Sequence, residues 1–322
     1  MILFFLIPLI LLVIAAVNFI QIRTPRSSSE LFESVAVVVP MRNEAENVEG
    51  VVATLSAQEG PFHFYLLDDN SEDSTWELLQ RFTAGDSRFT VIQGAPLADG
   101  WIGKTWALQQ LFMASKEEIV VSIDADERLT NDAINKAITS LRSARLDFLS
   151  PYPRQIAQTF GERLIQPLLQ WSWMSTVPLR IAEKSGRTSL AVANGQFFLV
   201  RKSALDQING FTAIAAEVLD DMELARKLIK SGEFGGVADG SSLAQTRMYK
   251  NFSEIKAGYG KSLWKAFGSQ SGSAGAIAFL FITGIAPVIA WFGGHPLGFL
   301  AYQFVVITRA LSASRSRGRI LD

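Results

Sequence analysis

The sequence reads VAVVVPMRNEAENV at residues 35–48, where a β-branched run passes into a polar stretch. Residues 35–39 are too few for a helix and are followed by Pro40, so they predict a strand. A helix should follow at about residues 44–58. This unit of strand, polar turn and helix recurs along the chain and therefore sets the expected architecture.

The same alternation continues downstream. It predicts strands at 62–67 (FHFYLL), 89–92 (FTVI) and 118–123 (EIVVSI), and helices at 74–81 and 104–114. Alternating helices and continuous apolar strands predict an α/β fold built on a mostly parallel sheet. Such sheets bind their ligands beyond the carboxyl ends of the strands. The polar residues at those ends are therefore the candidate site residues.

Composition limits the chemistry that is available to the chain. The 322 residues include no cysteine and only two histidines, His63 and His295. This excludes disulfides, thiolate metal sites and a cysteine nucleophile, and leaves little material for a Ser-His-Asp triad. With 30 Lys and Arg against 31 Asp and Glu, the net charge is −1, so no nucleic-acid partner is expected. Carboxylates must therefore carry any catalysis.

Three of the predicted strands end in polar sequence: PMRNE after the first, DDNS at 68–71 and DAD at 124–126. So many acids at one sheet edge are costly unless a cation lies among them. Because histidine is scarce, the expected cation is hard and divalent, Mg²⁺ or Mn²⁺. Asp69 would be available to bind a base or a ribose. The alternative is that such residues only cap turns and helices, as Asp68 or Asp73 alone would.

Four stretches of the chain together resemble the signatures of the family-2 glycosyltransferases, which are inverting enzymes that use nucleotide-diphosphate sugars. They are VVVPMRNEAENV at 37–48, LLDDNSEDST at 66–75, SIDADERL at 122–129 and LDDMELARKL at 219–228. Each is a weak pattern alone, but they cover about 190 residues in the order of the family. The resemblance implies the GT-A fold, the Rossmann-like mixed sheet of the nucleotide-diphospho-sugar transferases.

The resemblance assigns a donor pocket. Asp69 matches the residue that reads the nucleotide base, and Pro40, Arg42 and Glu44 are expected to line the same pocket. The segment GWIGK that ends at Lys104 resembles a Gly-Lys loop of many relatives. Lys104 is then either a point charge that approaches the donor phosphates or a solvated lysine at a helix start.

The resemblance also assigns the metal and the sugar pocket. Asp124 and Asp126 match the DxD pair, in which the first acid approaches the ribose and the last holds Mg²⁺ or Mn²⁺ on the donor diphosphate. The segment NGQFFLVR at 194–201 matches the strand that lines the acceptor side of the sugar pocket. Its expected polar contacts are Asn194, Gly195 and Gln196.

Inversion at the anomeric carbon needs a carboxylate that takes the proton of the acceptor hydroxyl. In the family this is the second acid of a pair that opens a helix, which matches Asp221, and Asp220 would hold local structure or the donor sugar. Asp220 departs from the pattern, because the family usually has Glu there. Glu217 and Glu223 are competitors, although Glu223 should point away toward flanking basic residues. Alternatively, both aspartates are helix caps favoured by the helix dipole.

The two ends of the chain are apolar. Residues 1–22 contain no charged side chain and predict a transmembrane anchor. No basic region precedes them, which argues against a cleaved signal peptide. No Asp, Glu, Lys or Arg occurs between Lys265 and Arg309, and GGHP at 293–296 interrupts this run as a tight turn. A transmembrane hairpin is therefore predicted over 274–313, with a buried hairpin of core helices as the alternative.

Charge sets the expected orientation of these segments. Basic residues follow the first apolar segment, precede the second and end the third, so the positive-inside rule places all three groups in the cytoplasm. Residues 30–250 should then form a cytoplasmic catalytic domain of a multi-pass protein of the cell membrane. Residues 251–270 interleave aromatic side chains with lysines, as interfacial amphipathic helices do. A helix packed on the globular domain is the alternative.

This layout, together with GWIGK at 100–104, resembles the carotenoid- and hopanoid-associated glycosyltransferases. It implies transfer from a nucleotide-diphosphate sugar, with a UDP-sugar expected, to a membrane lipid such as a carotenoid or another isoprenoid. Processive relatives carry Gln-x-x-Arg-Trp, whereas Gln245–Tyr249 has a different spacing, which favours the transfer of a single sugar. One alternative is a polyprenyl-phosphate glycosyltransferase, for which Arg247 is the one good acceptor cation. The other is a non-catalytic membrane binding protein with the same fold.

Overall fold

The computed structural model describes the backbone of residues 2–267 and 269–319, and the side chains of residues 5–260 and 269–319. The chain divides into two compact units, one α/β and one helical. The α/β unit consists of Arg23–Arg154 and Ala182–Met248, and the helical unit of Met1–Ile22, Gln155–Ile181 and Tyr249–Asp322.

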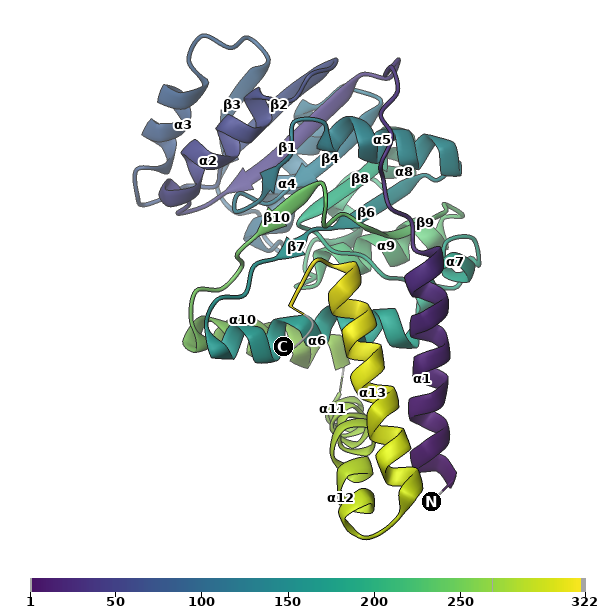
Figure 1. The fold of residues 1–322 in the computed structure, drawn as a ribbon. Helices are drawn as coiled ribbons and strands as arrows, with labels where there is room; N and C mark the ends of the chain where they lie inside the picture. Colours follow the sequence, from purple (N-terminus) through teal and green to yellow (C-terminus); the bar gives the residue numbers. More distant parts are fainter. Residues whose placement is uncertain (1, 268, 320–322) are drawn as a thin grey trace. The chain divides into compact units, whose positions relative to one another are not determined.

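The α/β unit contains a seven-stranded sheet of order β3-β2-β1-β4-β8-β6-β9 (Figure 1). Its strands are β1 Val35–Met41, β2 Phe62–Asp68, β3 Phe89–Gln93, β4 Ile119–Ile123, β6 Phe148–Tyr152, β8 Phe197–Arg201 and β9 Gly235–Asp239. Strand β8 runs antiparallel to β4 and β6, and the other pairs are parallel. The predicted α/β fold with a mixed sheet is therefore confirmed, and its first four strands are the four that the pattern predicted.

Helices cover both faces of this sheet. One face packs against α2 Ala45–Ser56, α3 Thr75–Thr83 and α5 Ala133–Ala144, and the other against α4 Gly103–Ala114, α8 Lys202–Gln207 and α9 Asp220–Lys230. In β1, Val37 and Val39 enter the first core, whereas Ala36 and Val38 enter the second. Both faces of the strand are buried, which explains why its sequence is continuously apolar rather than alternating.

The register of the strands brings their polar ends to one edge. Met41 lies opposite Asp68, and Val38 lies opposite Ser122, so the chain leaves β1, β2 and β4 at the same side of the sheet. Beyond β4, the short strand β5 Arg128–Leu129 pairs antiparallel with β10 Ala244–Thr246. This pairing brings the C-terminal part of the α/β unit back to the segment that follows β4. The remaining short elements are β7 Arg154–Gln155, α7 Leu179–Ala182, η1 Thr188–Leu190 and η2 Gly210–Ile214.

The turn before η2 has an unusual backbone conformation. Asn209 and Gly210 both have positive φ, 57° and 62°, a conformation that Asn tolerates better than most residues. A Cβ atom at Gly210 would lie 2.5 Å from the ring of Phe112, so this position also requires glycine for space. The turn is tied to α4, because the Phe211 N–H donates to Gln109 Oε1 at 2.7 Å.

The helical unit is built from helices distant in sequence. They are α1 Ile2–Gln21, α6 Phe160–Thr176, α10 Phe252–Phe267, α11 Gln270–Leu280, the π-helical turn η3 Phe281–Ile285, α12 Ala286–Phe292 and α13 Pro296–Arg315. Leu11, Trp171 and Val305 form a small apolar core that joins α1, α6 and α13. The Trp171 Nε1–H donates to Thr308 Oγ1 at 2.8 Å, so the buried indole N–H group of this core has a hydrogen-bond partner.

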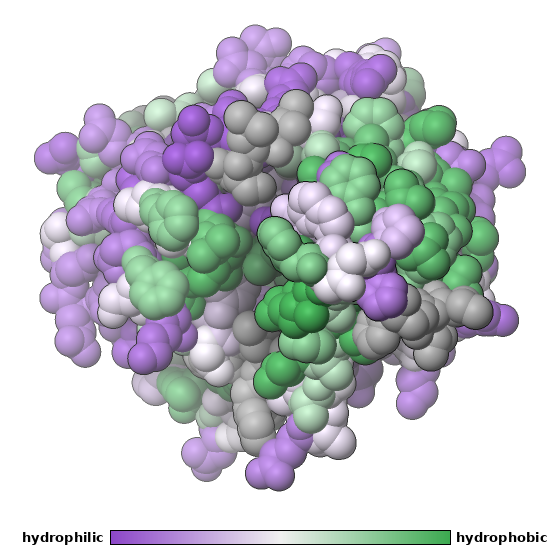
Figure 2. Space-filling view, turned by 60° about the horizontal axis from the view of Figure 1, so that its bottom comes forward, coloured by the Kyte–Doolittle hydropathy of each residue, from purple (hydrophilic) through white to green (hydrophobic). Residues whose placement is uncertain are grey.

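Within the described residues, two helical stretches are long and apolar enough to cross a membrane, Gln270–Phe292 and Pro296–Arg315. The predicted turn separates them, with Gly294 at φ 85°. The described apolar part of α1, Phe5–Gln21, has 17 residues and is shorter, so the N-terminal anchor stays a prediction. On the face that Figure 2 shows, apolar side chains form several exposed patches between polar ones. The exposed apolar residues of α11 to α13 include Ile277, Leu280, Ile285, Ile289, Phe292 and Leu297.

The predicted interfacial segment is only partly described. Helix α10 begins with Phe252, which is 58% exposed, and buries Ile255. The residues on which the amphipathic pattern mainly depended lie outside the described side chains: Lys261, Leu263, Trp264, Lys265 and Phe267. An interfacial location of this helix therefore stays a prediction.

Substitutions on α4 test the packing of the second core. Leu111 is fully buried, so Leu111→Ala should lower the free energy of unfolding by about 2–5 kcal/mol. Met113 on the same helix is 70% exposed, and Met113→Ala should change it by no more than about 0.5 kcal/mol. Denaturant unfolding of the purified chain measures both variants. Equal losses would contradict the placement of the buried face of α4.

Candidate active site

The DAD loop after β4 is fixed by backbone contacts. The Asp124 N–H donates to the Gln196 carbonyl at 3.1 Å, which ties the loop to the start of β8. The Arg128 guanidinium donates from Nη1 to the carbonyls of Ala125 and Glu127 at 3.0 and 2.9 Å. These bonds hold the loop in one conformation, so its two aspartates are presented by a rigid element rather than by a flexible one.

Lys104 lies among the acids of this edge. Its Nζ is 2.9 Å from Asp124 Oδ1 and 3.6 Å from Asp220 Oδ2. Burial alone would lower the pKa of Lys104, but the carboxylates of Asp124 and Asp220 outweigh it and raise that pKa. Lys104 is therefore not a solvated lysine at a helix start. It is the counter-charge that joins the DAD loop to the start of α9.

Asp221 is held at the second position of α9. Its Oδ2 accepts from the Gly195 N–H at 2.9 Å, and its Oδ1 accepts from the Met222 N–H at 2.7 Å. Burial and the charge of Asp220 raise the pKa of Asp221 to about 6, against the opposing effects of these N–H groups and of Lys104. A carboxylate with a pKa near 6 is a stronger base than an ordinary aspartate and is still ionised at neutral pH.

The surroundings of Asp221 explain its pKa. Asp221 borders a small cavity that is otherwise largely apolar, lined by Leu108, Phe198 and Leu224 among others. Such a lining disfavours the charged form of the carboxyl group. The competitor Glu223 pairs instead with the Arg226 guanidinium, so the expectation that it points away from the site is confirmed.

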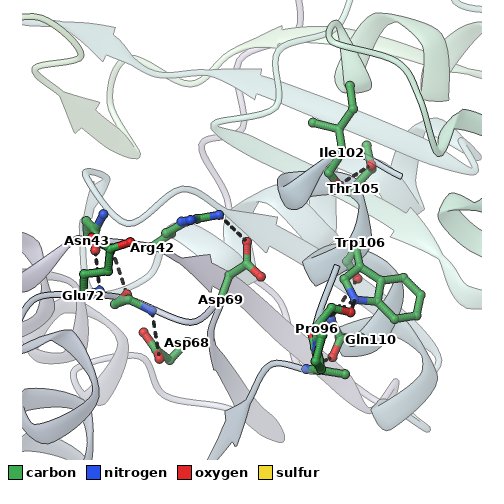
Figure 3. Close-up of polar contacts among 12 residues, drawn as sticks. Arg42, Asn43, Asp68, Asp69, Glu72, Pro96, Ile102, Thr105, Trp106 and Gln110 are labelled. Carbon is green, nitrogen blue, oxygen red and sulfur yellow. Dashed lines mark hydrogen bonds and ion pairs between the residues drawn. The ribbon is translucent and has the colours of Figure 1, made fainter. Parts of the chain in front are cut away.

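Asp69 and Arg42, which the sequence assigned to the pocket for the nucleotide base, lie next to each other. Figure 3 shows their charged groups pointing toward one another, with Arg42 Nη1 4.0 Å from Asp69 Oδ2. Asp69 is 7% exposed, and burial raises its pKa despite the guanidinium. A Cβ atom at Gly103 would lie 3.0 Å from Asp69 Oδ2, so this glycine allows α4 to begin close to the carboxylate. Pro40 lies in β1 opposite Leu67.

Glu44 is half-buried and feels the charges of the DAD loop. Its Oε2 accepts from Asn47 Nδ2 at 2.7 Å. Burial raises the pKa of Glu44, this hydrogen bond opposes the rise, and the charges of Asp126 and Asp124 add to it. Glu44 therefore belongs electrostatically to the acidic edge, and a role in base binding stays a prediction.

Two other acids of the edge have structural roles, as the capping alternative predicted. Asp73 Oδ2 accepts from the Ala45 N–H at 3.2 Å, and its Oδ1 accepts from the Thr75 N–H at 3.0 Å. Asp68 Oδ2 accepts from the Ser71 N–H at 3.3 Å. These bonds shape the turns that carry Asp69 and the start of α2.

The residues before β8 form a hydrogen-bonded turn. Asn194 Oδ1 accepts from the Gln196 N–H at 2.9 Å, and the Asn194 N–H donates to Ser150 Oγ at 2.8 Å. The Asn194 side chain therefore supports the turn, and Gly195 reaches the site through its N–H on Asp221. Contacts of Asn194, Gly195 and Gln196 with a donor sugar stay predictions.

Thr246 is a site residue that the sequence did not reveal. Its Oγ1 donates to Asp126 Oδ2 at 2.6 Å, across the pairing of β5 with β10. The sequence analysis considered Gln245–Tyr249 only because its spacing differs from the processive motif. The feature that would have revealed Thr246 is the antiparallel pairing of β10 with β5, and no local sequence pattern indicates this pairing.

The residues of the DAD loop fit a hard divalent cation. The side chain of Glu127 is fully buried, and neither of its oxygens has a hydrogen-bond partner within the described structure. Burial and the charges of Asp126 and Asp124 raise the pKa of Glu127 well above its usual range. The described side chains contain no group of three or more His, Asp or Glu placed to hold an ion. Mg²⁺ commonly takes only one or two protein carboxylates together with substrate phosphates, so the single carboxylate predicted to hold the ion, Asp126, would be compatible with such a site.

The sequence pattern of Glycosyl transferase family 2 matches residues 36–208, more than half of the chain. The protein therefore belongs to this family and is a glycosyltransferase. It is 24% identical over 275 residues to a 4,4'-diaponeurosporenoate glycosyltransferase of Staphylococcus haemolyticus, covering 84% of this chain and 71% of that enzyme. It is 26% identical over 198 residues to a beta-monoglucosyldiacylglycerol synthase of Trichormus variabilis, covering 57% of this chain and 39% of that enzyme.

Solved structures agree on the fold. A mannosyltransferase of Pyrobaculum calidifontis, in complex with GDP-Man and Mn²⁺, superposes with a TM-score of 0.58 at 17% identity, covering 98% of this chain and 95% of that one. Glucosyl-3-phosphoglycerate synthase of Mycobacterium tuberculosis, with Mn²⁺, UDP and phosphoglyceric acid, gives 0.50 at 15% identity over 74% of this chain and 82% of that one. At these identities the likeness establishes the GT-A fold.

The environment of Asp221 predicts a pH dependence. If its carboxylate must be ionised, kcat/KM for sugar transfer should rise with pH through a limb near pH 6. Lys104 lowers the pKa of Asp221, so Lys104→Met should move this limb to higher pH. The exposed Lys230 at the other end of α9 supplies the control, Lys230→Met, which should leave the limb in place. An unchanged limb in Lys104→Met would refute the coupling.

Proposed function

We propose that the chain moves a single sugar, with inversion, from a nucleotide-diphosphate sugar to a lipid acceptor in the membrane, such as a carotenoid or another isoprenoid. The observation that carries the proposal is the carboxylate of Asp221, which the Gly195 and Met222 N–H groups orient at the border of a small cavity and whose pKa of about 6 suits a base. The two sequence relatives described above are named as a glycosyltransferase of 4,4'-diaponeurosporenoate and as a synthase of monoglucosyldiacylglycerol, and both names support a lipid acceptor.

The donor would bind along the acidic edge. Asp69 and Arg42 offer an acceptor and a donor for the edge of a nucleotide base, and Asp124 would approach a hydroxyl group of the ribose. The expected donor is a UDP-sugar. One solved relative of the fold was crystallised with UDP and another with GDP-Man, which supports a nucleoside diphosphate.

Asp126 would hold the metal ion, and Thr246 orients its carboxylate through the bond at 2.6 Å. When bound, Mg²⁺ or Mn²⁺ neutralises the diphosphate as it leaves. Lys104 contributes a fixed positive charge at 2.9 Å from Asp124, and Asp220 keeps this ammonium group at the start of α9. The ordering of these groups before the reaction reduces the cost of charge reorganisation.

Asp221 would remove the proton of the acceptor. The acceptor oxygen forms a bond to the anomeric carbon on one face, and the bond to the diphosphate breaks on the opposite face. The proton passes to the carboxylate of Asp221, and the electron pair leaves with the diphosphate. The N–H groups of Gly195 and Met222 fix the orientation of the carboxylate, so the proton acceptor is preorganised.

Residues 160–170 of helix α6 support a membrane acceptor because the polarity of this part of the helix is reversed. Its polar residues Glu162, Gln166 and Gln170 are buried. In contrast, Phe160 is 78% exposed and Leu164 is 50% exposed. A helix that faces water shows the opposite arrangement. Together with the two candidate spans, this exposed apolar face suits contact with acyl chains, with the catalytic unit in the cytoplasm.

Replacement of the proposed base should change the stability of the fold very little and should lower the rate of sugar transfer strongly. We expect Asp221→Asn to lower kcat by about 10²–10⁴, the usual contribution of a positioned base, with little change in the KM for the donor. Glu223→Gln, two residues further along α9, is the control and should retain activity. Near-normal turnover of Asp221→Asn together with an inactive Glu217→Gln would assign the base to Glu217.

The metal prediction concerns Asp126 and Thr246. Asp126→Asn should abolish transfer without changing the melting temperature appreciably. Thr246→Val should raise the Mn²⁺ concentration for half-maximal activity by about 10–100-fold, because it removes an orienting contact to the ligand. Titration of activity with Mn²⁺ after removal of metal with EDTA measures both. Full activity of Asp126→Asn in excess EDTA would contradict the assignment.

The acceptor class is tested in membranes that contain the full chain. Incubation with labelled UDP-hexoses should place label in the organic extract, and mass spectrometry should find lipids heavier by one hexose. Membranes with Asp221→Asn serve as the control. Label confined to water-soluble products, or a ladder of several hexoses on one lipid, would overturn the proposed acceptor or the single transfer.

A further inference from the structure

A polar groove lies in the α/β unit between the segment that follows α1 and the helix α5. Its volume is about 200 Å³, and its lining consists of residues 23–27 with Ser140 and Ser143 of α5. One water needs only about 10–15 Å³ by the same kind of measure, so the groove can hold a group of many atoms. The family roles assigned above use none of these residues.

Hydrogen bonds hold the segment at both sides of the groove. Upstream, the Arg23 guanidinium donates to both carboxylate oxygens of Glu183 at 2.8 and 3.0 Å, and the Arg23 carbonyl accepts from the Asp239 N–H at 2.7 Å. Downstream, the Ser29 N–H donates to Asn135 Oδ1 and Thr139 Oγ1, both at 3.2 Å. The wall of the groove is therefore fixed in advance, which lowers the entropic cost of binding a ligand.

The charges of the groove favour an anion. Glu183 offsets the charge of Arg23, but Arg26 is exposed and has no ion-pair partner among the described side chains. The hydroxyl groups of Ser27 and Ser140 supply further donors, whereas the Ser143 hydroxyl donates to the Ser140 carbonyl at 3.1 Å. The residues that line the groove include no carboxylate. A guanidinium with surrounding hydroxyl donors is the chemistry that recognises phosphate oxygens.

We propose that this groove binds the phosphate of an anionic phospholipid headgroup. The inference rests on the proposed membrane location, because α1 ends at Gln21, only two residues before Arg23. The groove would then lie next to the cytoplasmic headgroup layer, where anionic lipids attract basic segments. A bound headgroup would fix residues 23–27 against α5. A soluble phosphate is the other source of the same chemistry.

The test is hydrogen–deuterium exchange of the full chain in detergent micelles. Short-chain phosphatidylglycerol should slow the exchange of amides in residues 24–28, and short-chain phosphatidylcholine should not. Arg26→Gln should raise the phosphatidylglycerol concentration that gives half-maximal protection by about tenfold or more. This is the change in affinity expected from the loss of one charged hydrogen bond. Arg81→Gln, at an exposed arginine of α3 outside the groove, should leave the effect unchanged.

The other arms separate the outcomes. Inorganic phosphate that protects these amides as strongly as phosphatidylglycerol would overturn the lipid as the occupant and assign the groove to a soluble phosphate. Equal protection by both lipids would overturn the anionic lipid as the occupant, because phosphatidylcholine carries the same phosphodiester group. Full protection in Arg26→Gln would overturn the phosphate site itself. The exchange readout does not depend on sugar transfer, so transfer measured on the same variants distinguishes failure of the groove from failure of the proposed function.

Discussion

The contact between Lys104 and the acids at the carboxyl edge of the sheet is the interaction on which the site depends. Parallel strands β1, β2 and β4 deliver their polar ends to one place, which concentrates carboxylates there. Lys104 reaches Asp124 at 2.9 Å and Asp220 at 3.6 Å, and so joins the DAD loop to the start of α9. Without this cation the same topology would place like charges together in a partly buried site, at a cost in stability.

The same arrangement gives neighbouring carboxylates different properties. Asp220 and Asp221 line the same small cavity, but Asp220 lies 3.6 Å from the ammonium group of Lys104, whereas Asp221 accepts from two backbone N–H groups and has a pKa of about 6. Asp126 is oriented by a hydroxyl group, and Glu127 is buried without a hydrogen-bond partner in the described structure. The environment thus gives acids of one type different properties. In the proposed mechanism this would let one edge of the sheet supply a counter-ion, a base and a metal ligand.

Local patterns predicted much of this structure, because strands, helices and the acids at strand ends depend on residues that are close together in the sequence. The four early strands and the pairing of Glu223 with a flanking basic residue followed from spacing and residue type alone. Thr246 was missed because it lies 120 residues from Asp126, and the reversed polarity of α6 was missed because burial, not composition, defines it. Lys104 was left undecided, since its role depends on a partner in α9 that only the fold brings near.

The central claim is that Asp221 activates the acceptor for direct displacement of the diphosphate. The most direct measurement is the anomeric configuration of the glycolipid formed from an α-linked nucleotide sugar, read by proton NMR before any rearrangement of the product. A single displacement with one base predicts a β-linked product. A product that retains the α configuration would contradict the account, because it would require a different mechanism at the anomeric carbon.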